Sequence, residues 1–147
     1  MSIRLPGGHS RVLIDTSVWI YHLEGHERLA NPAGRIIECI EDGKFRGITS
    51  ELTLLELTVK PLQLGRQDIA DDHEMLLGYF PNLQLEPISR NILMDAAGIR
   101  ARYRLRTPDS IQLATGLSVG ATLAVTNVDA WRDFPLIETL ILEDLVD

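Results

Sequence analysis

Four acidic residues lie at or near the points where predicted strands give way to helices: Asp15, Glu56, Asp109 and Asp129. Several carboxylates at one edge of a sheet repel one another unless a cation neutralises them. Mg²⁺ and Mn²⁺ bind a few carboxylate oxygens and keep several waters. A divalent cation held in this way activates water and offsets charge that develops on a phosphate. The pattern therefore predicts a metal site suited to hydrolysis at phosphorus.

Each acid also has a purely structural interpretation. Asp15 suits the N-cap of the helix that follows it, because Asp, Thr and Ser are good capping residues. Asp109 suits the positive end of its helix, and Asp129 suits an Asx-type turn. Glu56 is compatible with a half-exposed helical position. The recurrence of acids at equivalent edges of one α/β arrangement favours a functional site.

The acids can converge only if the chain folds as alternating strands and helices. Short apolar runs predict strands at residues 11–14, 45–49, 83–88, 122–126 and 140–142. Helical apolar stripes predict helices at about residues 17–23, 31–42, 50–59, 66–80, 92–103 and 107–119, with Pro61 ending the third. This alternation predicts an α/β fold with a mainly parallel sheet covered on both faces. Ligand sites of such sheets form at the carboxyl ends of the strands.

Length and composition are those of one globular domain. Of the 147 residues, 45% are hydrophobic and 24% are charged. We expect residues 1–10 to be a flexible lead-in and residues 11–147 to form a single domain. The sequence contains no apolar run of membrane-spanning length, and its N-terminus lacks the apolar stretch of a signal peptide. A single cysteine, Cys39, excludes an internal disulfide and a cysteine-based zinc site, and favours a reducing cytoplasm.

The charge balance argues against a non-specific nucleic-acid binder, because the net charge is −7. The 14 basic residues nevertheless include only two lysines, Lys44 and Lys60. Arginines bind phosphates and carboxylates through two points, so a locally basic groove is compatible with the acidic total. Four arginines precede Asp109: Arg100, Arg102, Arg104 and Arg106. We expect about half of them to be solvated helix-end cations and the others to contact RNA phosphates or acids of a partner.

Four segments together resemble the motif series of PIN-domain nucleases, and most closely the VapC-type ribonuclease toxins of bacterial toxin–antitoxin pairs. They are VLIDTSVWI, ITSELTLLEL, TPDSIQLATGL and ATLAVTN, in that order. The third is the most specific, because Pro108-Asp109 is followed by Gln112, Leu113 and Ala114. The resemblance implies a three-layer α/β/α fold, a Mg²⁺ or Mn²⁺ site and endonucleolytic cleavage of RNA. It also implies a homodimer and a cognate antitoxin whose C-terminal segment occupies the active-site groove.

The resemblance also assigns roles to residues. Asp15 resembles the family's first metal-binding acid, Glu56 the second and Asp109 the third. Asp15 and Asp109 are expected to be direct ligands, with Glu56 either ligating or orienting water. Ser17 and Thr126 are expected to orient these carboxylates or bound water by hydrogen bonds, although Ser17 is equally suited to an ordinary N-cap.

The fourth motif departs from the family pattern. Thr126 and Asn127 resemble the polar pair that precedes the fourth acid, but Val128 stands where that acid is usual and the acid follows as Asp129. Either Asp129 still reaches the site through a shifted loop, or Asn127 or water substitutes for it. The four histidines have no ligand-like spacing, and we interpret them as structural or surface residues.

Three other functions compete with this interpretation. A catalytically impaired PIN domain that only binds RNA or protein gains weight from the displaced fourth acid, whereas the three intact acids argue against it. A receiver-type phosphoacceptor domain needs a lysine at the end of its last strand, and no lysine follows Lys60. A haloacid-dehalogenase-type phosphatase needs a second aspartate two residues after the first, where this chain has Ser17.

Overall fold

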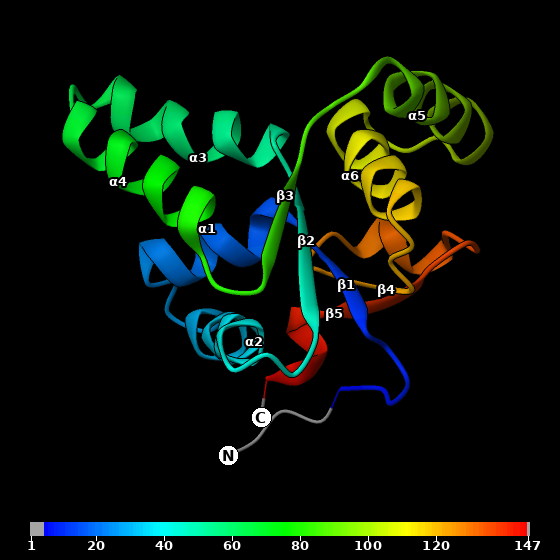
Figure 1. Ribbon diagram of the computed structural model, residues 1–147, viewed down its shortest axis with the longest axis horizontal. Coiled ribbons are helices and arrows are strands. Elements are labelled where there is room, and N and C mark those ends of the chain that lie inside the picture. Colours follow the sequence, from blue (N-terminus) through cyan, green and yellow to red (C-terminus); the bar gives the residue numbers. More distant parts are fainter. Residues whose placement is uncertain (1–4, 147) are drawn as a thin grey trace.

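The computed structural model describes residues 5–146, which form a five-stranded sheet between two layers of helices (Figure 1). The strands are β1 (Arg11–Ile14), β2 (Arg46–Ser50), β3 (Leu83–Glu86), β4 (Leu123–Thr126) and β5 (Glu138–Ile141). The α-helices are α1 (Thr16–Glu24), α2 (Ala30–Glu41), α3 (Leu52–Gln63), α4 (Gln67–Tyr79), α5 (Arg90–Tyr103) and α6 (Thr107–Ser118). Two 3₁₀ helices, η1 (Asp129–Asp133) and η2 (Leu142–Leu145), flank β5. The predicted three-layer α/β/α fold is confirmed.

The strands run parallel in the order β3-β2-β1-β4-β5. β1 lies in the middle, with Leu13 opposite Ile48 of β2 and Ala124 of β4. Because all neighbours are parallel, β1, β2 and β4 end at the same edge of the sheet. The residues that follow these three strands therefore lie close together.

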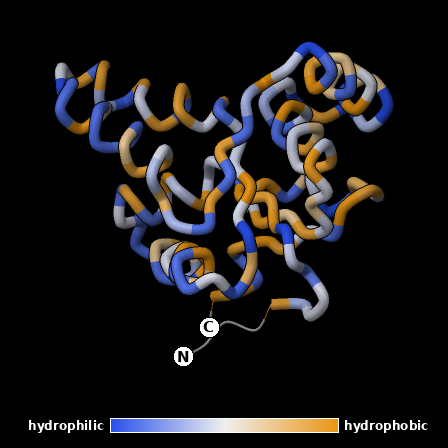
Figure 2. Tube along the Cα trace, in the orientation of Figure 1, coloured by the Kyte–Doolittle hydropathy of each residue, from blue (hydrophilic) through white to orange (hydrophobic). Residues whose placement is uncertain are grey.

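The core has two halves, one on each face of the sheet. Successive side chains of a strand point to opposite faces: Val12 and Ile14 pack with α1 and α2, whereas Leu13 packs with α5 and α6. Both halves consist mainly of aliphatic side chains, as the composition predicts. Figure 2 shows the hydrophobic residues gathered along the central strands and the hydrophilic ones toward the outer helix surfaces. Burial on both faces is why β1 and β4 read as unbroken apolar runs.

A glycine lets α6 approach the central strand closely. A Cβ atom at Gly116 would lie 2.9 Å from Cδ2 of Leu13, a distance at which one of the two elements would have to shift. The close approach holds α6 against β1, and its first turn then reaches the edge where β1 ends.

Pro61 does not end α3, contrary to the sequence-based prediction, because the helix continues to Gln63. A proline inside a helix leaves the carbonyl four residues earlier without its N–H partner. Here that carbonyl belongs to Leu57, and Nδ1 of His73 in α4 donates to it at 3.1 Å. The contact between α3 and α4 thus compensates for the proline and gives His73 the structural role that was expected.

The last strand begins two residues earlier than predicted, at Glu138. β5 is an edge strand that begins with the exposed, polar Glu138, so the apolar run that predicted the strand starts only at Leu140. The lead-in at residues 1–10 stays a prediction, since residues 1–4 lie outside the described part. Within that part, His9 contacts Thr122 and Glu138 at 2.7 and 2.6 Å. None of the helices described between residues 5 and 146 is long and apolar enough to cross a membrane.

Candidate active site

Three of the four predicted acids line one small pocket at the carboxyl edge of the sheet. Asp15 follows β1, Glu56 comes from α3 and Asp109 from the first turn of α6. The pocket has a volume of about 140 Å³, and Arg106 and Val128 complete its wall. Residues almost one hundred positions apart in sequence are thus brought together by the parallel topology.

Asp15 is held rigidly from both backbone and side chain. Its N–H donates to the carbonyl of Val125 at 3.0 Å, which extends the pairing of β1 with β4 by one residue. Its Oδ2 accepts hydrogen bonds from Ser17 Oγ at 2.8 Å and Thr126 Oγ1 at 2.7 Å. Among residues 5–146 no donor to Oδ1 is described, and its side chain makes no capping bond to α1. Asp15 occupies the N-cap position without capping, which leaves one carboxylate oxygen for a ligand.

Burial raises the pKa of Asp15 from 3.8 to about 6. The hydrogen bonds from Thr126 and Ser17 counteract this rise, while the negative charges of Asp109 and Glu56 add to it. The carboxylate form is therefore disfavoured in a pocket without a cation. A positive ion among the three acids would remove this penalty, so the electrostatics fit a cation site.

Glu56 is oriented by a buried hydrogen-bond network. Thr16 Oγ1 donates to Oε1 of Glu56 at 2.8 Å. That hydroxyl has one proton, so it must accept in its 2.7 Å contact with Thr53 Oγ1. Nε2 of Gln112 donates to both threonine oxygens at 3.1 Å. The direction of every bond in the network is therefore determined, and it ends on the Glu56 carboxylate.

The roles of Thr16, Thr53 and Gln112 in this network were not predicted from the sequence. A signal was present, because Gln112 is three residues after Asp109 and Thr53 is three residues before Glu56. Both pairs therefore share a helix face. In the described part of the chain, Oε1 of Gln112 has no hydrogen-bond partner although it is buried.

Asp109 forms an ion pair with the arginine three residues before it. Nε of Arg106 lies 3.0 Å from Oδ2 of Asp109, and Nη2 lies 3.4 Å from Oδ1. The Asp109 side chain is 5% exposed, whereas that of Arg106 is 72% exposed. Burial and this ion pair separate Asp109 from an ordinary first-turn acid that only favours the helix dipole.

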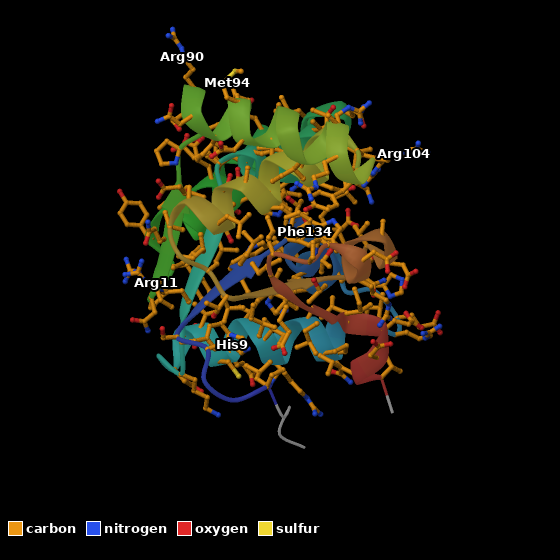
Figure 3. The ribbon with its side chains drawn as sticks, turned by 90° about the vertical axis from the view of Figure 1, so that its right-hand side faces the viewer. His9, Arg11, Arg90, Met94, Arg104 and Phe134 are labelled. Atoms are coloured by element: carbon orange, nitrogen blue, oxygen red, sulfur yellow. The ribbon has the colours of Figure 1, made fainter. Side chains whose placement is uncertain are left out.

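The other three arginines before Asp109 differ in their contacts. Arg100 Nη1 donates to the carbonyl of Leu105 at 2.8 Å, and Arg102 lies over the ring of Tyr103 at 5.6 Å from its centroid. Arg104 has left-handed backbone geometry with φ of 57° and ends α5, where its side chain is exposed (Figure 3). Arg100 and Arg102 thus have contacts within or near their own helix, whereas which of the four arginines contact RNA or a partner stays a prediction.

The structure does not bring Asp129 into the pocket. Its side chain is 86% exposed, and Oδ1 accepts from Nε of Arg132 at 2.6 Å. The turn after β4 closes two residues past the strand, where the N–H of Val128 donates to Thr126 Oγ1 at 3.0 Å. Val128 consequently faces the pocket, and Asp129 begins η1 on the outside.

Asn127 and Ser17 tie this turn to the rest of the site. The N–H of Asn127 donates to Ser17 Oγ at 3.1 Å, and its Oδ1 accepts from the N–H of Glu143 at 3.0 Å. Ser17 therefore links Asp15 to the turn and lies inside α1 rather than at its cap. The side-chain amide of Asn127 therefore hydrogen-bonds to the C-terminal segment and is not among the residues that line the pocket.

The chemical nature of the pocket fits a hard divalent cation, because its charged ligands are carboxylate oxygens. The side chains of residues 5–146 do not include a group of three His, Cys, Asp or Glu that is close enough to hold an ion as placed. One reason is visible in the geometry, since both oxygens of Asp109 face the guanidinium of Arg106. Asp15 and Glu56 each keep one oxygen free of a described protein donor in this part of the chain.

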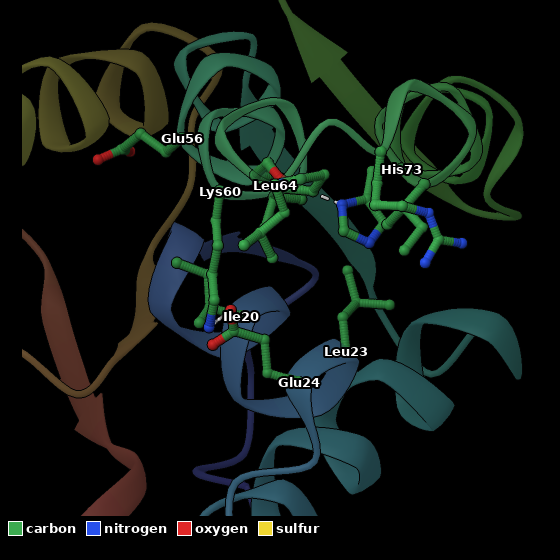
Figure 4. A pocket seen from close by; sticks show the side chains of 11 residues that line it. Ile20, Leu23, Glu24, Glu56, Lys60, Leu64 and His73 are labelled. Atoms are coloured by element: carbon green, nitrogen blue, oxygen red, sulfur yellow. Dashed lines mark hydrogen bonds and ion pairs between the residues drawn. The ribbon is translucent and has the colours of Figure 1, made fainter.

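A larger groove adjoins the acidic pocket and shares Ile20 and Glu56 with it. The groove has a volume of about 490 Å³ and lies between α1, α3 and α4 (Figure 4). Its wall is mostly apolar, with Lys60 paired to Glu24 at 2.9 Å on the rim. The apolar lining is formed by Ile20, Leu23, Leu57, Pro61, Leu64 and Ile69.

Comparison with known proteins agrees with this architecture. A sequence model of the PIN domain matches residues 12–134. No protein of curated function matches the chain in sequence.

Solved structures share the fold at low sequence identity. A toxin–antitoxin complex from Klebsiella pneumoniae contains a chain with 20% identity and a TM-score of 0.68, covering 89% of this chain and 97% of that one. VapBC2 from Rickettsia felis, bound to a promoter DNA fragment, gives 13% identity and a TM-score of 0.70, covering 89% and 98%. Mycobacterium tuberculosis VapC20, a sarcin–ricin loop cleaving toxin, gives 17% identity and a TM-score of 0.61, covering 77% and 86%.

Proposed function

The chain belongs to the PIN domain family, and from this we propose that it is a Mg²⁺- or Mn²⁺-dependent endoribonuclease that acts as the toxin of a toxin–antitoxin pair. The observation that carries the proposal is the convergence of Asp15, Glu56 and Asp109 on one pocket. The likeness in fold to a toxin that cleaves the sarcin–ricin loop supports RNA as the substrate.

In this proposal Asp15 and Asp109 hold the cation, and Glu56 either ligates it or orients water. When bound, the cation supplies activation of water and neutralisation of charge on the phosphate. Ser17 and Thr126 hold Oδ2 of Asp15, which leaves Oδ1 of this pocket-lining residue for the cation. Thr16 does the same for Glu56 by donating to Oε1. Such supporting hydrogen bonds lower the reorganisation needed when substrate binds.

The antitoxin partner is assigned to the groove between α1, α3 and α4. An apolar groove that continues into an acidic pocket suits a peptide segment with apolar side chains that ends near the catalytic acids. A bound segment there would cover Glu56 and block access of RNA. Toxin–antitoxin complexes among the structural relatives support a partner of this kind.

The proposal includes a homodimer, a cytoplasmic site of action and one domain spanning residues 11–147. Exposed apolar side chains on and near α5 (Leu93, Met94 and Leu136) are compatible with a contact between two copies. Sedimentation of the purified chain measures its mass in solution and tests the dimer directly.

A second candidate function is a PIN domain that binds RNA or protein without cleaving. The outward position of Asp129 favours it, because one acid of the usual set is missing from the pocket. The two candidates differ in whether cleavage requires the remaining acids.

The deciding experiment is cleavage of a panel of structured RNAs by the purified chain with Mn²⁺ or Mg²⁺. We expect cleavage that EDTA abolishes and that Asp109→Ala lowers by about a thousandfold or more, since loss of a ligand removes cation binding. Glu74→Ala is the matched control, because it removes an exposed acid of α4. Cleavage that survives EDTA or Asp109→Ala would refute the proposal, and absence of cleavage with retained RNA binding would favour the second candidate.

A further inference from the structure

Arg106 places a positive charge at the wall of the acidic pocket, where it forms an ion pair with the buried carboxylate of Asp109. Among the ion pairs described within residues 5–146, the pair of Arg106 and Asp109 is the only one in which the acid is buried. Both nitrogens of the guanidinium edge face the carboxylate, at 3.0 and 3.4 Å. The guanidinium thus occupies the side of Asp109 from which a cation would be bound.

The backbone of Arg106 is fixed, whereas its side chain is free to move. The carbonyl of Arg106 accepts from both the N–H and the Oγ of Ser110, each at 2.9 Å. The side chain is 72% exposed, and within the described part of the chain its guanidinium is bonded to Asp109 alone. Release from Asp109 therefore breaks the contacts with one residue only and exposes the guanidinium fully to water.

Arg106 lines the same pocket as all three acids of the site. Asp109 raises the pKa of Arg106 most, and Asp15 and Glu56 add smaller contributions of the same sign. The pocket therefore contains one positive charge, on a mobile side chain, against three carboxylates. A divalent cation at this place would be repelled by Arg106 and attracted by the same carboxylate that Arg106 holds.

We propose that Arg106 is an exchangeable counter-ion: it neutralises Asp109 in the cation-free site, yields that carboxylate to the divalent cation, and then binds an RNA phosphate. The inference rests on the proposed function. Arginine suits both positions, because its planar fork matches carboxylate and phosphate equally well. The exchange leaves no buried charge uncompensated, because the cation takes the place of the guanidinium beside Asp109 and the exposed side chain of Arg106 regains water.

If Arg106 exchanges in this way, one variant should change two quantities in opposite directions, the Kd for Mn²⁺ and the KM for RNA. Arg106→Gln removes the competitor of the cation, so the Kd for Mn²⁺ falls. It also removes a phosphate contact, so the KM for RNA at saturating Mn²⁺ rises. A residue that merely supports the fold would weaken both or neither.

The test compares Arg106→Gln with Arg90→Gln in the full chain. Arg90 is exposed at the first residue of α5 and projects away from the molecule (Figure 3), so its loss changes the net charge equally without touching the pocket. Calorimetric titration with Mn²⁺ alone should give a Kd about three- to tenfold lower for Arg106→Gln and within about twofold of wild type for Arg90→Gln. Arg106→Lys keeps the charge without the fork and should fall between the two.

The outcomes separate this inference from the proposed function. If the wild type binds Mn²⁺ and cleaves RNA but Arg106→Gln binds Mn²⁺ no more tightly, the counter-ion role is refuted and the nuclease remains. If the Kd falls while the KM for RNA is unchanged, the phosphate contact is refuted. If no variant binds Mn²⁺ or cleaves RNA, both proposals fail. Near-ultraviolet circular dichroism verifies that each variant is folded.

Discussion

Asp15 and Asp129 follow neighbouring parallel strands of the same sheet, yet only one of them reaches the pocket. Asp15 comes directly after β1 and is 5% exposed, whereas Asp129 comes three residues after β4 with a side chain that is 86% exposed. Asp15 and Val128 line the pocket. Asp129, only one residue further along the chain than Val128, contacts Arg132 and solvent instead.

The largest expected effect on cleavage comes from removing one of these two carboxylates, and the other serves as its comparison. Asp15→Ala should lower RNA cleavage by about a thousandfold or more, because it removes a carboxylate proposed to hold the cation. Asp129→Ala should change cleavage by less than about threefold, because its partner is Arg132 on the outer surface. Initial rates under identical Mn²⁺ measure both. A loss with Asp129→Ala that matched Asp15→Ala would show that the loop closes on the site during turnover.

A second test removes the bond that links the two strand ends. Thr126→Val deletes the hydroxyl that donates to Asp15 Oδ2 at 2.7 Å. Without this donor the pKa of Asp15 rises further above about 6, since the bond counteracts the effect of burial. Cleavage at pH 7 should fall about tenfold or more, and the acid limb of the pH–rate profile should move to higher pH.

Thr126→Ser is the matched control, because it keeps the hydroxyl and loses one methyl group. It should behave like the wild type. A uniform fall in rate for Thr126→Val, with no change in the acid limb, would mean that Thr126 serves packing instead of Asp15.

Much of this contrast was accessible from sequence. The apolar runs of β1 and β4, the helix stripes and the three converging acids were predicted, because buried parallel strands and amphipathic helices leave strong local patterns. The outward turn of Asp129 was left open, because it depends on the hydrogen bond from the N–H of Val128 to the side-chain Oγ1 of Thr126, which the residue types alone do not specify. The network of Gln112 and the extension of α3 past Pro61 were missed for a different reason, since partners distant in sequence determine them.

A third test concerns stability without a cation. The pKa of Asp15 is 3.8 in the unfolded chain and about 6 when folded, so between these values the folded state binds the extra proton. The free energy of unfolding therefore falls as pH rises through this window, by about 3 kcal/mol in total. Asp15→Asn should remove that penalty and raise the Tm at pH 7.5 in EDTA by on the order of 10 °C.

The gain should shrink as the pH falls below about 6 and vanish below about pH 3, where Asp15 is neutral in both states. Asp129→Asn provides the comparison, because an exposed acid paired with Arg132 carries no burial penalty. Scanning calorimetry at several pH values measures both variants. A gain for Asp15→Asn that did not depend on pH would assign it to packing rather than to charge.

The smallest expected effect comes from building the missing acid at the position that faces the pocket. Val128→Asp restores the Thr-Asn-Asp order of the family and places a carboxylate on the wall beside Asp15 and Asp109. With a cation present, the fourth carboxylate should lower the Kd for Mn²⁺ by about two- to fivefold, because each added charge strengthens a hard-cation site modestly. Val128→Asn has nearly the same shape without the charge and should leave the Kd unchanged. Titration at pH 8 keeps Asp15 ionised, because this pH lies well above its pKa of about 6. Equal Kd values for the two variants would mean that side chains at position 128 cannot reach the cation, and the site would then depend on three acids alone.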